Sequence, residues 1–117
     1  MSSVIRIISK KVTKVTSYGI PRNKFTEYTN SLSEAAKCSS GFVSSESYWA
    51  TPVSYLDNSH TSMKIVSISN WKSLKDWNNW YYSNKRKEIN EKYSDIIESE
   101  NFDILQKKAP TDDIFLL

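Results

Sequence analysis

A tryptophan-rich stretch at residues 70–83 limits what this chain can fold into more than any other feature. It holds three of the four tryptophans and two of the seven tyrosines. Ser73, followed three residues later by Asp76, resembles a capping box at the start of a helix. The spacing after this cap places four apolar residues on one helical face: Leu74, Trp77, Trp80 and Tyr81. Such a face is either a bulky core against a sheet or the wall of an aromatic pocket, and the spacing leaves both open.

The rest of the chain alternates between strand-like and helix-like patterns. Runs rich in β-branched and aromatic residues predict four strands, over 4–12, 42–49, 63–69 and 102–107. In the first strand isoleucines alternate with Arg6, and we expect Lys10 and Lys11 to bring the chain to the surface. In the second, simple alternation puts Phe42, Ser44, Glu46 and Tyr48 on one face and Val43, Ser45, Ser47 and Trp49 on the other.

Two helices are predicted between the strands. The first begins near Pro21, ends before Gly41 and carries an apolar stripe of Phe25, Tyr28, Leu32, Ala35 and Ala36. The second begins at Ser73, and a further stripe lies beyond Ser83: Ile89, Tyr93, Ile96 and Ile97. Cations at 85–87 would oppose the dipole of a helix that began there, so we favour one unbroken helix. The alternative is that this cluster attracts an anionic group, with Arg86 as the candidate for carboxylate or phenolate binding.

Length and composition indicate a single domain over residues 1–117, with a core at 4–107 and an apolar tail at 108–117 that we expect to dock on the fold or on a partner. One cysteine excludes an intramolecular disulfide and fits a reducing compartment. The first apolar run is too short for a signal peptide or a membrane span, so a cytoplasmic protein is expected. The net charge of +3 is spread among acidic residues and does not indicate a nucleic-acid footprint. His60, in a predicted connection at 50–62, has no partners at metal-ligand spacing, and no metal site is expected.

The order of elements predicts an α+β fold with a four-stranded antiparallel sheet. Two helices can cover only one face of such a sheet. The first three strands carry large apolar residues on both faces, so something must cover the second face. A second copy of the same sheet is the economical solution, and a homodimer is therefore expected.

Three segments resemble the antibiotic biosynthesis monooxygenase family of the dimeric α+β barrel superfamily. They are Gly41-Phe42-Val43-Ser44-Ser45-Glu46, Ser69-Asn70-Trp71-Lys72-Ser73 and Trp80-Tyr81-Tyr82-Ser83-Asn84-Lys85-Arg86. The resemblance covers about residues 4–107. It implies a ferredoxin-like β-α-β-β-α-β protomer that pairs through its sheet, with a small cavity between sheet and helices. Many members are cofactor-independent oxygenases of aromatic polyketides, while others degrade haem, remove quinones or have no known activity.

The resemblance also suggests which residues could line the cavity. In the haem-degrading branch the tryptophan of the second long helix corresponds to Trp80, the iron-binding histidine to Asn90, and a strand-one asparagine to a position near Ser9 or Lys10. An amide is a poor ligand for haem iron, so haem degradation is disfavoured and no cofactor is expected. The pocket candidates are Trp80, Tyr81, Arg86, Asn90, Tyr93 and Ser9, and no catalytic residue is assigned. Trp71 and Trp77 are expected to be core anchors, whereas Trp80 could either pack in the core or form part of the pocket wall.

Three functions remain open at this point. The first is a small cofactor-independent monooxygenase that acts on a phenol, quinol or polyketide-like aromatic, with Arg86, Tyr93 or Asn90 stabilising a phenolate. The second is a non-catalytic dimer of the same fold that binds a small ligand or acts in stress. The third is an RNA-recognition module, which needs aromatic residues on the exposed faces of the first and third strands. Those strands have none, so this function is disfavoured.

Overall fold

Four antiparallel strands and three helices make up the part of the chain that the computed structural model describes, residues 4–14, 21–50 and 64–106. In chain order they are β1 (Ile5–Thr13), α1 (Arg22–Lys37), β2 (Phe42–Ala50), β3 (Lys64–Trp71), α2 (Leu74–Tyr81), α3 (Asn84–Lys92) and β4 (Ile97–Leu105). The strands lie in the order β2-β3-β1-β4. The predicted α+β, ferredoxin-like architecture is confirmed. The 50–62 connection with His60, apart from its first residue, and the 108–117 tail lie outside the described residues.

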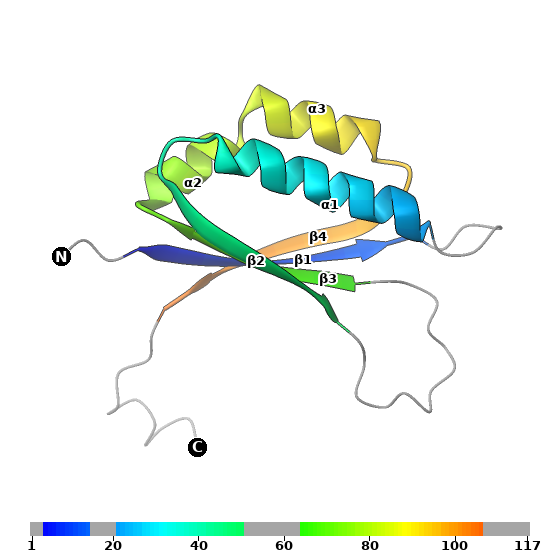
Figure 1. Cartoon of the computed structure of the whole chain (residues 1–117), viewed down its shortest axis with the longest axis horizontal. Helices are drawn as coiled ribbons and strands as arrows, with labels where there is room; N and C mark the ends of the chain where they lie inside the picture. The colour runs from blue at the N-terminus through cyan, green and yellow to red at the C-terminus, as the bar shows by residue number, and fades with distance from the viewer. Residues whose placement is uncertain (1–3, 15–20, 51–63, 107–117) are drawn as a thin grey trace, which may run out of the picture.

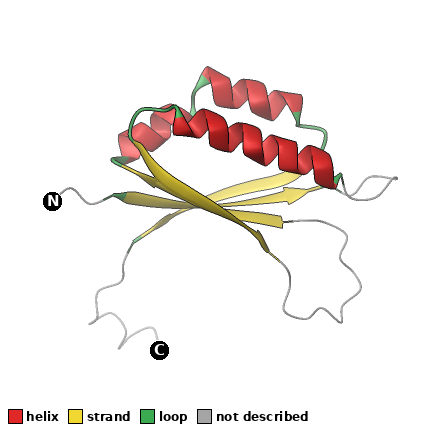
Figure 2. Cartoon of the chain, in the orientation of Figure 1, coloured by secondary structure: helices red, strands yellow, loops and turns green. Residues whose placement is uncertain are grey.

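All three helices lie over the same face of the sheet (Figure 1), and the colouring by secondary structure shows the two layers clearly (Figure 2). The core lies between these layers. It consists of Ile7, Ile65 and Trp71 from the sheet together with large side chains from the helices and their flanks: Phe25, Tyr28, Leu32, Trp80, Ile89, Tyr93 and Ile96. No helix in the described ranges is long and apolar enough to span a membrane.

The sheet presents alternate residues of β1 to the helices. Ser9 pairs with Ser67 of β3, and Lys11 pairs with Ile65, so both share the face that carries the core. Lys11 is 7% exposed, whereas Lys10 points to the opposite face and is exposed. The expectation that both lysines reach the surface is therefore wrong for Lys11. Strict two-residue alternation from Ile7 decides its orientation.

A bulge alters the faces of β2. The pairing with β3 shifts between Phe42 and Ser44, because Phe42 opposes Trp71 and Ser44 opposes Asn70. Phe42 therefore lies on the helix side, where its ring meets the Trp71 indole edge-on at 5.3 Å. The expected grouping of Phe42 with Ser44 is wrong, because a bulge inserts one residue and reverses the alternation before it.

The second helical region is broken at Ser83. This residue has extended backbone angles (φ −68°, ψ 151°), and its hydroxyl accepts a hydrogen bond from the Arg86 N–H at 3.2 Å, which is the geometry of an N-cap. The favoured unbroken helix is therefore wrong. The predicted cap at Ser73 is confirmed, since its Oγ accepts from the Asp76 N–H at 3.1 Å. Leu74, expected on the buried face, is 39% exposed.

The last strand begins earlier than predicted. After α3 the chain turns, the Lys14 N–H donates to the Ile96 carbonyl at 2.7 Å, and Ile97 already pairs with Thr13. Ile97 belongs to β4 and not to the helical stripe. The five additional residues of β4, 97–101, include Glu100, which the register places opposite Lys11.

Candidate functional site

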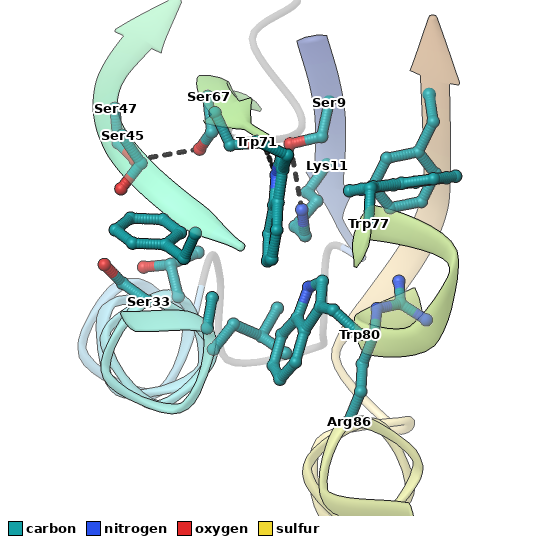
Figure 3. Close-up of a pocket in the computed structure, with 16 residues that line it drawn as sticks. Ser9, Lys11, Ser33, Ser45, Ser47, Ser67, Trp71, Trp77, Trp80 and Arg86 are labelled. Carbon is teal, nitrogen blue, oxygen red and sulfur yellow. Dashed lines mark hydrogen bonds between the residues drawn. The ribbon is translucent and has the colours of Figure 1, made fainter. Parts of the chain in front are cut away.

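A cavity of about 80 Å³, partly open to solvent, lies between the sheet and the helices. Its walls come from all four strands and all three helices, and Figure 3 shows their side chains turned toward one another. The volume is about half of the roughly 150 Å³ of an apolar cavity that takes up benzene. The space therefore suits a single-ring molecule or a few waters, and a polycyclic ligand requires side chains to move.

Three indoles form the aromatic part of the wall. Trp71 at the end of β3 is 1% exposed, and Trp80 on α2 is 8% exposed. Trp77 is half-buried and packs edge-on against Phe102 at 5.6 Å. Trp71 and Trp80 therefore belong to the core and also line the cavity, so the choice between core and pocket wall is not exclusive.

Serine hydroxyls form much of the remaining wall. Six line the cavity: Ser9, Ser33, Ser45, Ser47, Ser67 and Ser69. The Trp71 indole N–H donates to Ser69 Oγ at 2.9 Å, so the Ser69 hydroxyl hydrogen is left to donate elsewhere. Ser47 and Ser67 Oγ are 2.8 Å apart across neighbouring strands. The five serines on the strands, all except Ser33 of α1, make the sheet side of the cavity a surface that can donate to an oxygen atom.

Lys11 brings a basic group into this surface. Its ammonium donates to Ser9 Oγ at 3.0 Å and lies 5.2 Å from the centre of the Phe102 ring. Burial lowers the pKa of Lys11 from 10.5 to about 8, against the opposing effect of the Glu100 carboxylate, while Arg86 lowers it further. A lysine with such a pKa can both hold and release a proton near neutral pH.

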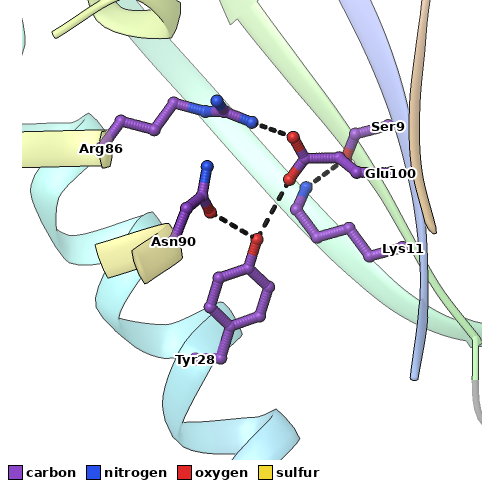
Figure 4. A network of polar contacts seen from close by, with 6 residues as sticks. All are labelled: Ser9, Lys11, Tyr28, Arg86, Asn90 and Glu100. Atoms are coloured by element: carbon purple, nitrogen blue, oxygen red, sulfur yellow. Dashed lines mark hydrogen bonds and ion pairs between the residues drawn. The ribbon is translucent and has the colours of Figure 1, made fainter. Parts of the chain in front are cut away.

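A polar network continues from the cavity toward the surface (Figure 4). Glu100 accepts from Arg86 in an ion pair and from the Tyr28 hydroxyl at 3.0 Å. The Tyr28 hydroxyl also lies 2.7 Å from Oδ1 of the Asn90 side-chain amide. Burial, and then the charge and hydrogen bond of Glu100, raise the pKa of Tyr28 well above its usual value, so this phenol stays protonated.

The candidates named from the sequence fall into two groups. Ser9, Trp80 and Arg86 line the cavity. Tyr81 does not line the cavity, but its ring centre lies 4.3 Å from the guanidinium carbon of Arg86. Asn90 and Tyr93 stand beside Tyr28, where the two tyrosine rings are 5.4 Å apart, and neither lines the cavity.

Sequence reasoning missed two charged residues: Lys11, which lines the cavity, and Glu100, which forms an ion pair with the cavity-lining Arg86. The signal for Lys11 was present, because it follows Ile7 by four residues in a strand and therefore shares its face. Glu100 lies outside the predicted strand at 102–107, so its position opposite Lys11 became evident only from the observed start of β4 at Ile97. In the described ranges no three metal-binding side chains are clustered.

Comparisons with known proteins establish what the fold is. No protein-family model matches the sequence, and no curated protein matches it either. Among solved structures, a Nitrosomonas europaea protein provisionally classed as an antibiotic biosynthesis monooxygenase is 14% identical, with a TM-score of 0.63 over 92% of this chain and 95% of that one. SnoaB, a cofactor-independent oxygenase from Streptomyces nogalater, is 11% identical, with a TM-score of 0.61 over 92% of this chain and 99% of that one.

The chain has the fold of the antibiotic biosynthesis monooxygenases. The resemblance seen in the sequence is confirmed at this level. A conserved protein from Methanosarcina mazei extends the comparison, at 19% identity and a TM-score of 0.60 over 89% of this chain and 94% of that one. Sequence identities of this size show that the fold is shared but do not show that the activity is shared. The function must therefore be argued from the cavity itself.

Proposed function

We propose that this chain is a cofactor-independent oxygenase that acts on a small, single-ring phenol or quinol. The observation that carries the proposal is one cavity in which indoles, serine hydroxyls and a buried lysine converge. The indoles provide flat apolar surfaces for an aromatic ring, and the polar groups provide a place for its oxygen. The oxygenase activity of SnoaB, a protein with the same fold, supports the reaction class.

The protein's part in such a reaction is orientation, exclusion of water and stabilisation of a phenolate. A phenol that is converted to a quinone supplies all four electrons, one atom of O₂ enters the ring as the second carbonyl, and the other leaves as water. Deprotonation raises the electron density of the ring and makes transfer to O₂ easier. A cavity with few waters strengthens every charge interaction that holds the phenolate in place.

Oxygen uptake tests this proposal directly. Aerobic incubation with mono- and dihydroxybenzenes should consume O₂, and Trp80→Phe should lower the rate about tenfold or more because the ring loses one wall of the cavity. Leu74→Ala, on the exposed side of the same helix, is the control and should leave the rate unchanged. Absence of uptake across a broad panel of one-ring phenols contradicts the oxygenase.

A second candidate is a binding protein of the same fold without catalysis. The small volume of the cavity favours it, since little room remains for O₂ beside a bound ring. The two candidates differ in outcome: both predict saturable binding of one-ring phenols, and only the oxygenase predicts oxygen consumption.

We also propose that the active form is a homodimer in the cytoplasm. The sheet face opposite the helices carries half-buried aliphatic residues that no described element covers: Ile8, Val12, Val66 and Ile68. Pairing of two such faces would remove this surface from water. The free and exposed Cys38 thiol fits a reducing compartment.

A further inference from the structure

The charges around the cavity do not balance. Lys11 and Arg86 are both cationic side chains, and both are nearly buried. The one carboxylate beside them, Glu100, already accepts from Arg86 and from Tyr28. Among the residues that the structure describes, the acceptor for the Lys11 ammonium is the neutral hydroxyl of Ser9. Within the described ranges, one positive charge at the cavity is therefore left without an anion of its own.

An unbalanced buried ammonium costs folding free energy. A protein can relieve this cost by releasing the proton or by taking up an anion. The Lys11 amine lines the space that a ligand would occupy, beside the Trp71 indole (Figure 3), so an anion that entered the cavity would meet it directly.

We propose that Lys11 is the proton-exchange and anion-binding group of this cavity, and that the ligand is a single-ring molecule with an acidic oxygen, bound as its oxyanion. The inference rests on the proposed function for the location of the ligand site, and it does not require that O₂ reacts. When Lys11 is a neutral amine, the ligand O–H bond breaks and an N–H bond forms on the amine; when Lys11 is already an ammonium, the ligand's proton passes to water as the oxyanion binds. The electron pair stays on the ligand oxygen, which then forms the missing ion pair.

The neighbouring hydroxyls have hydrogens to offer this oxygen. Ser9 accepts from Lys11, and Ser69 accepts from the Trp71 indole, so each keeps its own O–H for donation. Hydrogen bonds to an ionised oxygen are stronger than those to a neutral one. The site therefore favours the oxyanion over the neutral ligand, while the indoles of Trp71 and Trp80 hold the ring in either form.

The groups that face Lys11 leave it as the residue that titrates. Glu100 faces it from β4, Arg86 from α3 and Tyr28 from α1 (Figure 4). Arginine keeps its proton at all working pH values, and the raised pKa of Tyr28 keeps the phenol neutral. The neighbours from α2 and β3, including Trp80 and Ile65, do not titrate. The pKa of Lys11, about 8, thus sets the pH at which the cavity loses its positive charge.

A matched pair of probes tests the proposal. 4-Nitrophenol has an acidic oxygen and a coloured phenolate form, and 4-nitroanisole is the same ring with that oxygen methylated. We expect the wild-type chain to bind 4-nitrophenol at least tenfold more tightly than 4-nitroanisole. The bound probe should show phenolate absorbance at a pH where the free probe is still mostly neutral. Equal affinities, a bound probe in the neutral form, or no binding of 4-nitrophenol would overturn the proposal.

Two variants separate the roles of Lys11. Lys11→Met should bind both probes with similar affinity, and a retained preference for 4-nitrophenol contradicts the assignment. Lys11→Arg keeps the charge but cannot release its proton. For the wild type, affinity for the phenolate should fall above pH 8, whereas for Lys11→Arg it should stay level. A parallel fall in both proteins would overturn proton exchange at Lys11. These readouts are independent of O₂ uptake, so a correct anion site in a protein without oxygenase activity is recognised as such.

Discussion

At the scale of single residues, the cavity combines groups that a stable core would avoid. A lysine and an arginine are placed where aliphatic side chains would pack, and serines replace the β-branched residues typical of a sheet interior. Such a choice lowers stability and is expected where function requires polar groups.

Replacing Lys11 by Met tests this cost. The folded-state pKa of Lys11 is about 8, below the value of 10.5 for an unhindered lysine, so between these pH values the unfolded chain binds more protons. The stability of the wild type should therefore rise with pH in this window, by on the order of 2–3 kcal/mol. Lys11→Met should lack this rise. Urea unfolding at pH 7, 8, 9 and 10 measures the difference, and parallel curves for the two proteins would contradict a buried, titrating lysine.

Glu100 should stabilise the fold, because its negative charge offsets the positive charges of Lys11 and Arg86. Glu100→Gln removes the carboxylate that interacts with both Lys11 and Arg86 and leaves the two cations without it. We expect a loss of about 2–3 kcal/mol, somewhat below the value for a fully buried pair because the Glu100 side chain is 18% exposed. Glu98→Gln, an exposed position on the same strand, should change the unfolding free energy by less than about 0.5 kcal/mol. Similar losses in the two variants would argue against the network.

At the scale of elements, two short features set the position of the cavity walls. The break at Ser83 separates α2, which carries Trp80, from α3, which carries Arg86. Gly41 joins α1 to β2 with a φ of +81°, and a Cβ atom there would overlap the Asp76 side chain at the start of α2. Both features allow helices to lie close to the sheet where the indoles meet.

Removing the cap at Ser83 should lower the free energy of unfolding by a moderate amount. Ser83→Ala leaves the first N–H groups of α3 without their acceptor and should cost about 1 kcal/mol in thermal or urea unfolding. Ser40→Ala, at an exposed turn, should be close to neutral. A Ser83→Ala variant as stable as the wild type would contradict a stabilising cap at the start of a separate helix α3.

Gly41→Ala should be more severe. The residue has a positive φ, and the added methyl group would collide with a carboxylate that is hydrogen-bonded to the Ser73 cap. We expect a loss of more than about 2 kcal/mol in urea unfolding. A neutral result would show that α2 can move away from this turn without cost.

Sequence reasoning succeeded where one periodic pattern decided the structure. The stripe in α1 and the cap at Ser73 were both recognised from spacing, and the four strands were placed correctly between the helical regions along the chain. It failed where two tendencies competed. At Ser83, helical periodicity continued on both sides, but the backbone is extended there and the Ser83 hydroxyl caps the start of a new helix. At Phe42, one bulge reversed the face, and bulges have no dependable sequence signal outside glycine positions. The burial of Lys11 was overlooked because charge was given more weight than alternation.

At the scale of the whole molecule, one face of the sheet is covered and the other is not covered by any described element (Figure 1). Ile8 and Ile68 are direct cross-strand neighbours near the centre of the open face, and charged side chains such as Arg6 and Lys10 lie on it as well. This mixture is suited to an interface with a second copy, in which aliphatic residues pack centrally and charges pair toward the rim.

Substitution on this face tests the dimer. The wild-type chain should have a mass in light scattering of twice the 13.5 kDa of one chain, and Ile68→Lys should reduce it to that of a monomer. Asn78→Lys, on the exposed side of α2, adds the same charge elsewhere and should remain dimeric. A monomeric wild type at tens of micromolar, or a dimeric Ile68→Lys, would contradict pairing through the sheet.

The central claim is that the cavity between sheet and helices takes up a one-ring phenol. Calorimetric titration of 4-nitrophenol into the wild type and into Ser33→Met tests it most directly, because Ser33 lines the cavity and a longer side chain there fills it without changing any charge. Asn30→Met, exposed on the same helix, is the control. We expect one ligand per chain for the wild type and the control, and at least tenfold weaker binding for Ser33→Met. Equal binding by all three proteins, or none by the wild type, would contradict the claim.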